Sequence, residues 1–168
     1  MKFKIVEEVI RPENFRITNY KFRPDGTLDV FQTVNLEQKN LTELPFKFGK
    51  IEGSFWCYNN KFKTLKGAPI EVEGDFDCSI NYLTSLKYAP EKVGDRFNCS
   101  LNRLIDLKYS PKEVKSDFHC DNNNLTSLTG LNLDGVNGKI YLRDNPNLKL
   151  TEKEEFWRTL NPGRMILK

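Results

Sequence analysis

The sequence lacks the features that identify most enzymes, membrane proteins and secreted proteins. No apolar run approaches the roughly 20 residues that a bilayer span needs. Gly-x-Ser-x-Gly, Gly-rich phosphate-loop and His-Glu-x-x-His motifs are all missing. The N-terminal stretch MKFKIVEEVI carries glutamates where a signal peptide needs its apolar core. We therefore expect a cytoplasmic protein with reduced cysteines, no membrane association and no enzymatic activity.

An excess of one charge is also missing. The 168 residues include 26 basic and 23 acidic side chains, well interleaved, for a net charge of +3. That balance argues against a nucleic-acid-binding tail or a polybasic membrane patch. Hydrophobic residues make up 38% of the chain, which suits one ordered domain with a real core.

Histidine and cysteine are few, and their placement does not favour chemistry. The single histidine, His119, stands between Phe118 and Cys120, so strand alternation directs its side chain away from the thiol. We expect an exposed surface histidine rather than the base of a Cys–His pair. The cysteines lack the short C-x-x-C spacing of metal sites and behave as small buried hydrophobes, with metal or redox chemistry as the alternative. We expect no cofactor and no metal. The four lie 21 residues apart, at Cys57, Cys78, Cys99 and Cys120.

This spacing belongs to an internal repeat. The string FDCSINYLTSL, from Phe76, returns every 21 residues as variants of F-x-C-x-x-N-x-(L/F)-x-x-L, and a fixed period of this length predicts a solenoid. Phe76 and Cys78 alternate with Asp77, which places the first two inward on a short strand. Asn81 lies in the turn, where its amide can pair with unsatisfied backbone groups. Strands one period apart then form a parallel sheet.

Divergent copies flank the four regular ones, so we expect about six coils. Val34 and Leu36 begin the first copy, in which Lys39 replaces the asparagine, and Ile140 and Leu142 begin the last. The predicted fold is an α/β-type solenoid dominated by a parallel β-sheet. We expect one structural domain with an N-terminal β cap over 1–27, a solenoid over 28–150 and a helical cap over 151–168.

Both predicted caps have local sequence signals. MKFKIVEEVI and NFRITNYKF alternate as strands do, and Pro24-Asp25-Gly26 signals a turn. At the other end, TEKE from Thr151 is a capping box that starts a short helix. We expect the helix to pack Phe156, Trp157 and Leu160 over the last coil.

The pattern resembles the leucine-rich repeat, in which L-x-L-x-x-N-x-L lines a curved solenoid. Phenylalanine and cysteine stand here in the first two leucine positions. The short period resembles the compact bacterial type of the repeat, and so do the prolines in the outer bends, Pro69, Pro90 and Pro111. Charged residues such as Glu91-Lys92 follow these prolines and complete the bend. The strings NLTELPFKFGKIEGSFWCYNN and GDFDCSINYLTSL resemble, more narrowly, leucine-rich-repeat proteins predicted in tailed bacteriophages. The resemblance implies protein recognition through the concave face and no catalytic residues. A phage origin implies a host-encoded partner in the host cytoplasm, such as a protein of antiviral defence.

The outward strand positions are the candidate binding residues. They vary from coil to coil, as a surface that recognises one partner requires and as an unconstrained surface also shows. Exposed aromatic residues are typical of interface anchors, with packing of Trp56 and Tyr141 against the caps as the alternative. The predicted partner-binding residues are Trp56, Tyr58, Asp75, Asp77, Arg96, Asn98, Asp117, His119, Asp121, Tyr141 and Arg143.

A basic ridge is a second candidate surface. Lys66, Lys87 and Lys108 repeat at the coil spacing, with Tyr88 and Tyr109 beside the last two. Such a ridge can meet phosphates, which makes nucleic-acid binding an alternative function, although surface lysines also serve solubility. A structural role in the virion or its assembly is a further alternative. Oligomeric state is not predicted.

Overall fold

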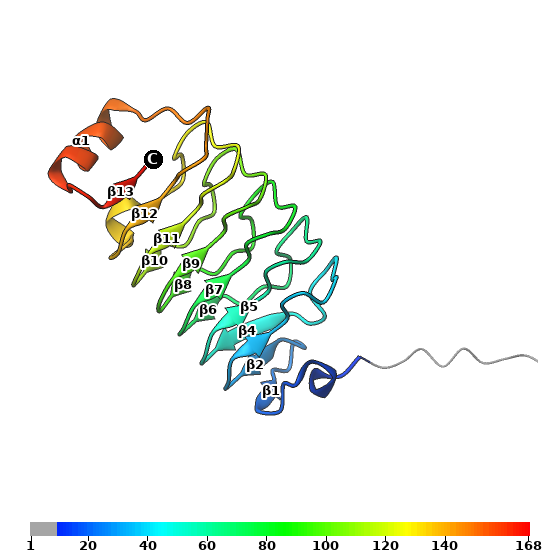
Figure 1. Ribbon diagram of the computed structural model, residues 1–168. Helices are drawn as coiled ribbons and strands as arrows, with labels where there is room; N and C mark the ends of the chain where they lie inside the picture. Colours follow the sequence, from blue (N-terminus) through cyan, green and yellow to red (C-terminus); the bar gives the residue numbers. More distant parts are fainter. Residues whose placement is uncertain (1–9) are drawn as a thin grey trace, which may run out of the picture.

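The computed structural model describes residues 10–168, in which the chain winds into a solenoid of about seven turns with one parallel sheet and one largely parallel sheet (Figure 1). Sheet B has seven strands, in the order β13-β12-β11-β9-β7-β5-β3. They are β3 (Val34–Asn35), β5 (Phe55–Trp56), β7 (Phe76–Asp77), β9 (Phe97–Asn98), β11 (Phe118–His119), β12 (Ile140–Tyr141) and β13 (Met165–Ile166). The predicted parallel sheet and its 21-residue register are confirmed, because Phe55, Phe76, Phe97 and Phe118 are successive partners.

A second sheet runs along the outer bends, where the sequence indicated only turns. Sheet A has six strands, in the order β1-β2-β4-β6-β8-β10. They are β1 (Tyr20–Phe22), β2 (Leu28–Val30), β4 (Phe48–Ile51), β6 (Glu71–Val72), β8 (Lys92–Val93) and β10 (Glu113–Val114). The prediction that Glu91-Lys92 forms only a bend is therefore wrong, because Lys92 begins a strand. Two residues per coil are too few to show the alternation by which strands are recognised in a sequence.

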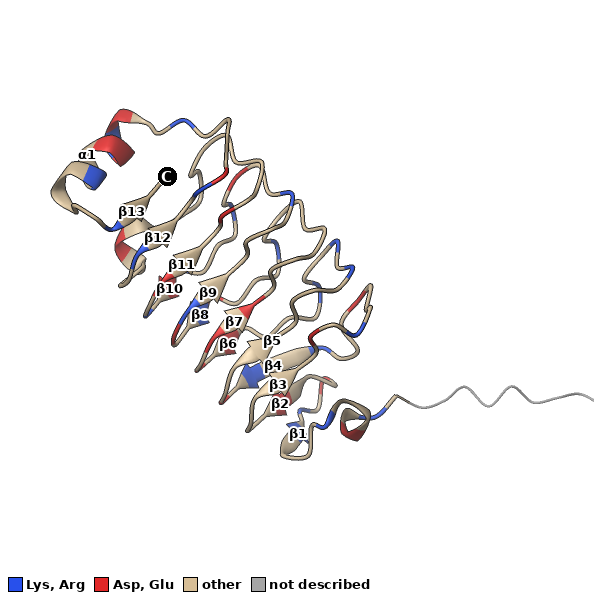
Figure 2. Cartoon of the chain, viewed as in Figure 1, with Lys and Arg blue, Asp and Glu red and all other residues tan. Residues whose placement is uncertain are grey.

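Sheet A carries alternating charges on its outer surface. Lys50, Glu71, Lys92 and Glu113 are successive cross-strand partners, and Figure 2 shows these charges alternating along the stack. Opposite charges directly across a strand pair stabilise it, whereas like charges destabilise it. The alternation therefore helps to keep neighbouring coils in register.

A strand-free segment joins the two sheets within each coil. We call the stack of these segments the strand-free wall, and it comprises residues 59–67, 80–88, 101–109 and 122–130. In Figure 1 these segments run on the side of the stack away from the strand arrows. Two apolar residues three positions apart in each segment, such as Leu83 and Leu86, point inward and are buried, as predicted.

The core is a set of side-chain columns. The rings of Phe55, Phe76, Phe97 and Phe118 are fully buried and stack with centroid separations of 5.6, 5.6 and 5.1 Å. The four cysteines form the next column; all are fully buried with free thiols, which confirms their predicted core position. Burial raises the pKa of the Cys57, Cys78 and Cys99 thiols.

A buried asparagine bonds each coil to the one before it. The Asn102 side-chain nitrogen donates to the carbonyl oxygens of Cys78 and Cys99, both at 3.1 Å, and of Ser100 at 3.2 Å. Its Oδ1 accepts the backbone N–H of Leu83 at 2.9 Å. These bonds confirm the predicted role of the asparagine position. The equivalent residues Asn60, Asn81, Asn123 and Asn145 bond in the same way.

The N-terminal region only partly follows its prediction. The Pro24–Gly26 turn joins β1 to β2 as an antiparallel hairpin, as predicted. Of the strand predicted over residues 14–22, only Tyr20–Phe22 is a strand. Asn14 and Phe15 instead end a 3₁₀-helix (Pro12–Phe15), which proline favours because it fixes φ near −65° and suits the first position of a helix. The strand predicted over the first ten residues falls almost wholly in residues 1–9, outside the described part of the chain.

The C-terminal region adds a helix and one more strand. Helix α1 (Glu152–Leu160) begins at its Thr151 capping box, as predicted, and follows the short 3₁₀-helix η2 (Leu133–Gly135). Trp157 packs against the core, and its indole donates to Asp134 at 2.8 Å. Phe156 and Leu160 are each 64% exposed, so the prediction that they cover the last coil is wrong. One face of this nine-residue helix meets the coil, and β13 then returns to extend sheet B.

None of the helices within residues 10–168 has the length and apolar character needed to cross a membrane.

We call the five stacked, buried asparagines (Asn60, Asn81, Asn102, Asn123 and Asn145) the asparagine ladder. Replacement of a ladder asparagine should lower the free energy of unfolding far more than replacement of the exposed residue beside it. Asn123→Ala leaves the buried Leu104 N–H without its partner and removes one of the two amide donors to the Cys99 carbonyl, at a cost of about 3 kcal/mol. The exposed Asn124 is the matched control, and Asn124→Ala should change stability by less than about 0.5 kcal/mol. Urea unfolding of both variants measures the difference; equal losses would contradict the ladder's role.

The buried thiols of Cys57, Cys78 and Cys99 predict a loss of stability at alkaline pH. Because their pKa values are raised by folding, they stay protonated in the folded state, whereas unfolded thiols ionise above about pH 8.5. The unfolding free energy should thus be unaffected below that pH and fall above it, by up to about 1.4 kcal/mol per pH unit for each thiol. Urea unfolding in reductant at increasing pH measures the slope. Cys99→Ala should make it shallower, and an unchanged slope would contradict the argument.

Candidate functional site

All eleven predicted partner-binding residues lie on or beside one surface, the outer face of sheet B. Trp56, Asp77, Asn98, His119 and Tyr141 are successive cross-strand partners in a single row. Nine of the eleven are partly buried, and the other two, Arg96 and Arg143, are exposed. The surface is a row of five chemically different side chains on a backbone that repeats.

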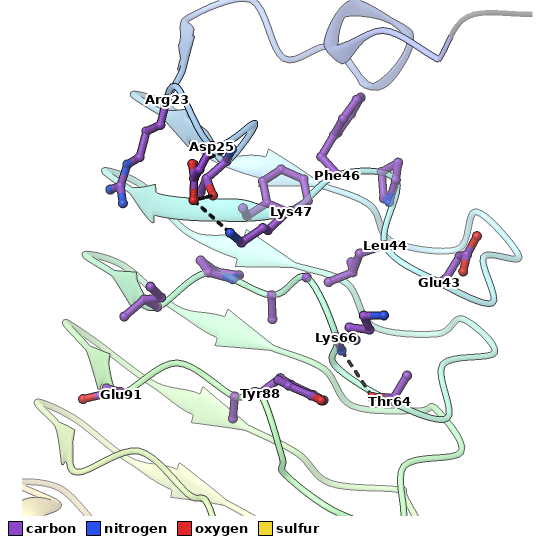
Figure 3. Close-up of a pocket in the computed structure, with 18 residues that line it drawn as sticks. Arg23, Asp25, Glu43, Leu44, Phe46, Lys47, Thr64, Lys66, Tyr88 and Glu91 are labelled. Atoms are coloured by element: carbon purple, nitrogen blue, oxygen red, sulfur yellow. Dashed lines mark hydrogen bonds and ion pairs between the residues drawn. The ribbon is translucent and has the colours of Figure 1, made fainter.

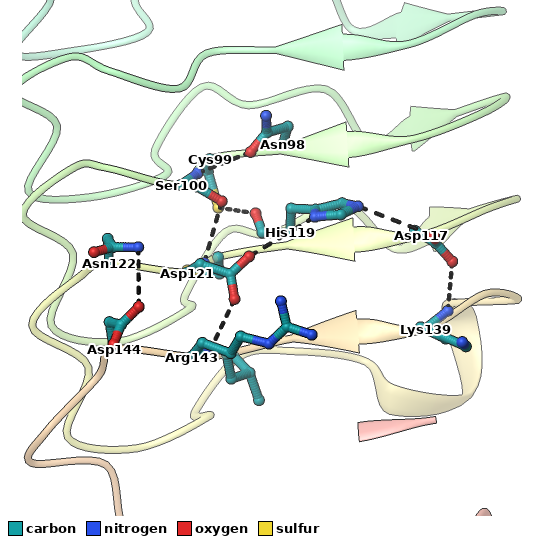
Figure 4. Close-up of polar contacts among 12 residues, drawn as sticks. Asn98, Cys99, Ser100, Asp117, His119, Asp121, Asn122, Lys139, Arg143 and Asp144 are labelled. Atoms are coloured by element: carbon teal, nitrogen blue, oxygen red, sulfur yellow. Dashed lines mark hydrogen bonds and ion pairs between the residues drawn. The ribbon is translucent and has the colours of Figure 1, made fainter. Parts of the chain in front are cut away.

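His119 is the centre of a polar and aromatic cluster on this face, and Figure 4 shows its polar neighbours Asp117 and Asp121. Its ring stacks on Tyr141 with a centroid separation of 4.3 Å and an interplanar angle of 8°. Its two ring nitrogens lie 4.0 Å from an Asp117 oxygen and 3.8 Å from an Asp121 oxygen. The outward direction is as predicted, but the side chain is only 25% exposed because Tyr141 covers it.

Two opposing effects set the pKa of His119, which are burial of its side chain and the negative charge of nearby carboxylates. Desolvation lowers the pKa of the imidazole, and the carboxylates of Asp121 and Asp117 act in the opposite direction. The net shift is downward, so His119 is mainly neutral at pH 7. A neutral imidazole presents one donor and one acceptor to a partner.

Several acidic residues on this face also bond one coil to the next. The Oδ1 atoms of Asp75 and Asp117 accept the backbone N–H groups of Arg96 and Lys139, at 3.1 and 2.7 Å. Asp121 accepts the N–H of Arg143 at 2.9 Å (Figure 4). Sequence reasoning missed this structural role, although acceptor side chains recur at one position of successive coils. Replacing these residues would disturb the solenoid as well as its surface.

The remaining side chains of the face form short polar and aromatic contacts. Asn98 donates to Asp77 at 3.0 Å, and the Arg143 guanidinium lies 5.5 Å from the centre of the Tyr141 ring. The Tyr58 hydroxyl donates to Glu37. Trp56 is the large aromatic residue at the other end of the row, where it lies partly buried beside Asp77. These groups can recognise a partner by hydrogen bonds and aromatic packing.

The predicted basic ridge lies on the strand-free wall. Lys66, Lys87 and Lys108 are all exposed. The Lys87 ammonium lies 5.2 Å from the centre of the Tyr88 ring, and Lys108 pairs with Asp106 at 3.1 Å. The ridge therefore exists, with one of its three charges already paired.

A groove beside this ridge was not predicted (Figure 3). Its volume is about 810 Å³, and Leu44, Phe46, Ile70 and Tyr88 supply much of its apolar lining. Lys66 lies at the groove with no acidic partner in the described chain, whereas Lys47 pairs with Asp25 at 2.9 Å. Sequence reasoning missed it because the lining comes from three successive coils and the hairpin, which only the winding brings together.

Within residues 10–168, no group of three or more His, Cys, Asp and Glu side chains is placed to hold a metal ion. Comparison with protein-family models, with curated proteins and with solved structures finds no match to this chain.

The single histidine allows the cluster to be tested directly. Nuclear magnetic resonance titration of His119 should give a pKa below its ordinary value of about 6.5, because burial disfavours the imidazolium. Tyr141→Ala removes the covering ring while Asp117 and Asp121 remain, so the pKa should rise. Tyr58→Phe serves as a control distant from the imidazole. A pKa that does not rise in Tyr141→Ala would contradict the stacked arrangement.

Proposed function

We propose that the protein is a non-catalytic protein-binding module of the leucine-rich-repeat type, which recognises its partner through the outer face of sheet B. The observation that supports this best is the row from Trp56 to Tyr141, in which five different side chains stand in register on an invariant core. A backbone held by stacked coils loses little conformational entropy on binding, which favours affinity.

The origin and partner belong to the same proposal. The strings that resemble phage leucine-rich-repeat proteins favour a phage protein that acts in the cytoplasm of the infected cell. A host protein, such as one of antiviral defence, is then the expected partner. The varied surface suits one specific partner better than a general adhesive role.

Two structural features of the face guide its test. Asp75, Asp117 and Asp121 bond the coils together, so their replacement would confuse binding with folding. Trp56 and Arg143 lie at opposite ends of the face, and within residues 10–168 no hydrogen bond of their side chains joins one strand of sheet B to the next. Arg143 is exposed, and its guanidinium donates to the Lys168 carbonyl at 3.2 Å. These two positions are therefore the informative ones.

We expect affinity capture from lysate of infected cells to retain one host protein on the intact chain, which is identified by mass spectrometry. The double variant Trp56→Ala/Arg143→Ala should weaken its measured Kd by about 10- to 100-fold, the effect of removing an aromatic and an arginine anchor. Lys92→Ala/Glu113→Ala, on sheet A, is the matched control and should bind as the intact chain does. Equal binding by the sheet B variant would show that this face is not the recognition surface.

A further inference from the structure

Large apolar side chains are exposed on the two middle segments of the strand-free wall. Six of them, between 40% and 61% exposed, occupy residues 80–88 and 101–109. The equivalent segments 59–67 and 122–130 expose none. The six are Ile80, Tyr82, Tyr88, Leu101, Ile105 and Tyr109. Exposed apolar residues gathered on one surface mark an interaction site more often than scattered ones do.

Two of these apolar residues hold a backbone conformation that their residue types disfavour. Ile80 and Leu101 have positive φ values of 53° and 55°. At the same position, the other coils place polar residues, Gln38, Asn59, Asn122 and Asp144, of which the asparagines and the aspartate tolerate this conformation far better. A β-branched residue with positive φ is unusual. In the middle coils, an exposed apolar side chain at this position therefore costs stability that an asparagine would not.

At the other edge of the wall, two tyrosines likewise replace a residue type that adopts positive φ more easily. Tyr88 and Tyr109 have φ values of 73° and 66°, whereas the first and last segments place Gly67 and Gly130 there. Glycine reaches positive φ without strain. Four strained, exposed apolar positions thus bracket the same two segments. Strain kept at one surface is evidence for a function of that surface.

The wall is also strongly basic. Segments 59–67, 80–88 and 101–109 contain six basic residues and one acidic residue. Among these basic residues only Lys108 has an acidic partner in the described chain. Lys87 and Arg103 instead lie over the rings of Tyr88 and Tyr82, at 5.2 and 4.7 Å. The wall combines an apolar strip with unneutralised positive charge.

We infer that this wall is a second interaction surface, separate from the sheet B face, which binds an acidic protein segment carrying apolar side chains. The positive charge attracts carboxylates, and the exposed apolar residues require apolar partners. The groove at Tyr88 and Lys66 is placed to receive one apolar side chain. Single-stranded nucleic acid fits less well, because three of the six exposed apolar residues are aliphatic and offer no face on which a base can stack. Two of the three tyrosine rings, those of Tyr82 and Tyr88, already have a cation over them.

Synthetic polymers test the inference on the whole protein. Fluorescence anisotropy with labelled random Glu/Tyr copolymer, poly-glutamate and oligothymidylate separates the apolar requirement from charge alone. The copolymer should bind at least about tenfold more tightly than poly-glutamate. Equal affinities would overturn the inference, and tighter binding of oligothymidylate would overturn it in favour of nucleic acid.

The decisive variant is Ile80→Asn/Leu101→Asn, which restores the residue type of the outer coils. It should bind the copolymer no better than poly-glutamate, while its thermal midpoint rises because the backbone strain is relieved. Unchanged copolymer binding, or a lower midpoint, would overturn the inference.

Two charge variants complete the experiment. Lys63→Glu/Lys87→Glu should weaken the binding of both acidic polymers, whereas Lys115→Glu/Lys139→Glu, which lies off the wall, should not. A greater loss in the second variant would overturn the assignment to this wall. Trp56→Ala/Arg143→Ala should bind the copolymer as the intact chain does. The proposal for the sheet B face and the proposal for the strand-free wall can therefore be refuted independently of each other.

Discussion

The solenoid depends on one constraint, which is that each coil buries a turn whose backbone groups must still be hydrogen-bonded. A turn between a sheet and an irregular wall leaves carbonyl and N–H groups that no ladder can pair. The ladder asparagine meets this need because one amide supplies two donors and an acceptor. The Asn102 side chain bonds to its own coil and to the preceding one. It therefore fixes the distance between the two coils as well as the conformation of the turn. The phenylalanine and cysteine columns can then repeat without interruption, with cysteine filling the narrower position as a small hydrophobe.

This construction leaves most surface positions free of a role in building the protein, although Asp75, Asp117 and Asp121 also bond neighbouring coils. Each coil shows three sides to solvent, and each has a different character. Sheet A alternates charge, sheet B carries a varied polar and aromatic row, and the strand-free wall is basic and apolar in its middle. A core that repeats leaves all three sides open to variation without loss of the fold. We therefore propose that recognition takes place on the two sides whose composition is not explained by stacking alone.

The repeat positions were predictable because their environment recurs. Phe76, Cys78, Asn81 and Leu83 each meet the equivalent residue one coil away, so the regular coils require the same or a similar residue type there. The surface positions were less predictable. His119 was expected to be exposed and is instead covered by Tyr141, a residue 22 positions later. Asp75 and Asp117 were expected to be available to a partner and instead also accept backbone N–H groups of the next coil. Both outcomes depend on side chains that only the stacking of coils brings together.

The sequence by itself determined the period, the inward and outward direction of the strand residues, the asparagine turn and the start of the C-terminal helix. These features follow from local alternation, from the spacing of like residues and from capping, which act over short distances along the chain. Only the tertiary structure decided that the bends form a second sheet, that β13 extends the stack and that a groove opens beside Tyr88. It also showed that Ile80 and Leu101 hold positive φ while exposed. Backbone conformation at a single position and contact between distant coils depend on how the whole chain winds. Neither can be predicted from the residue types alone.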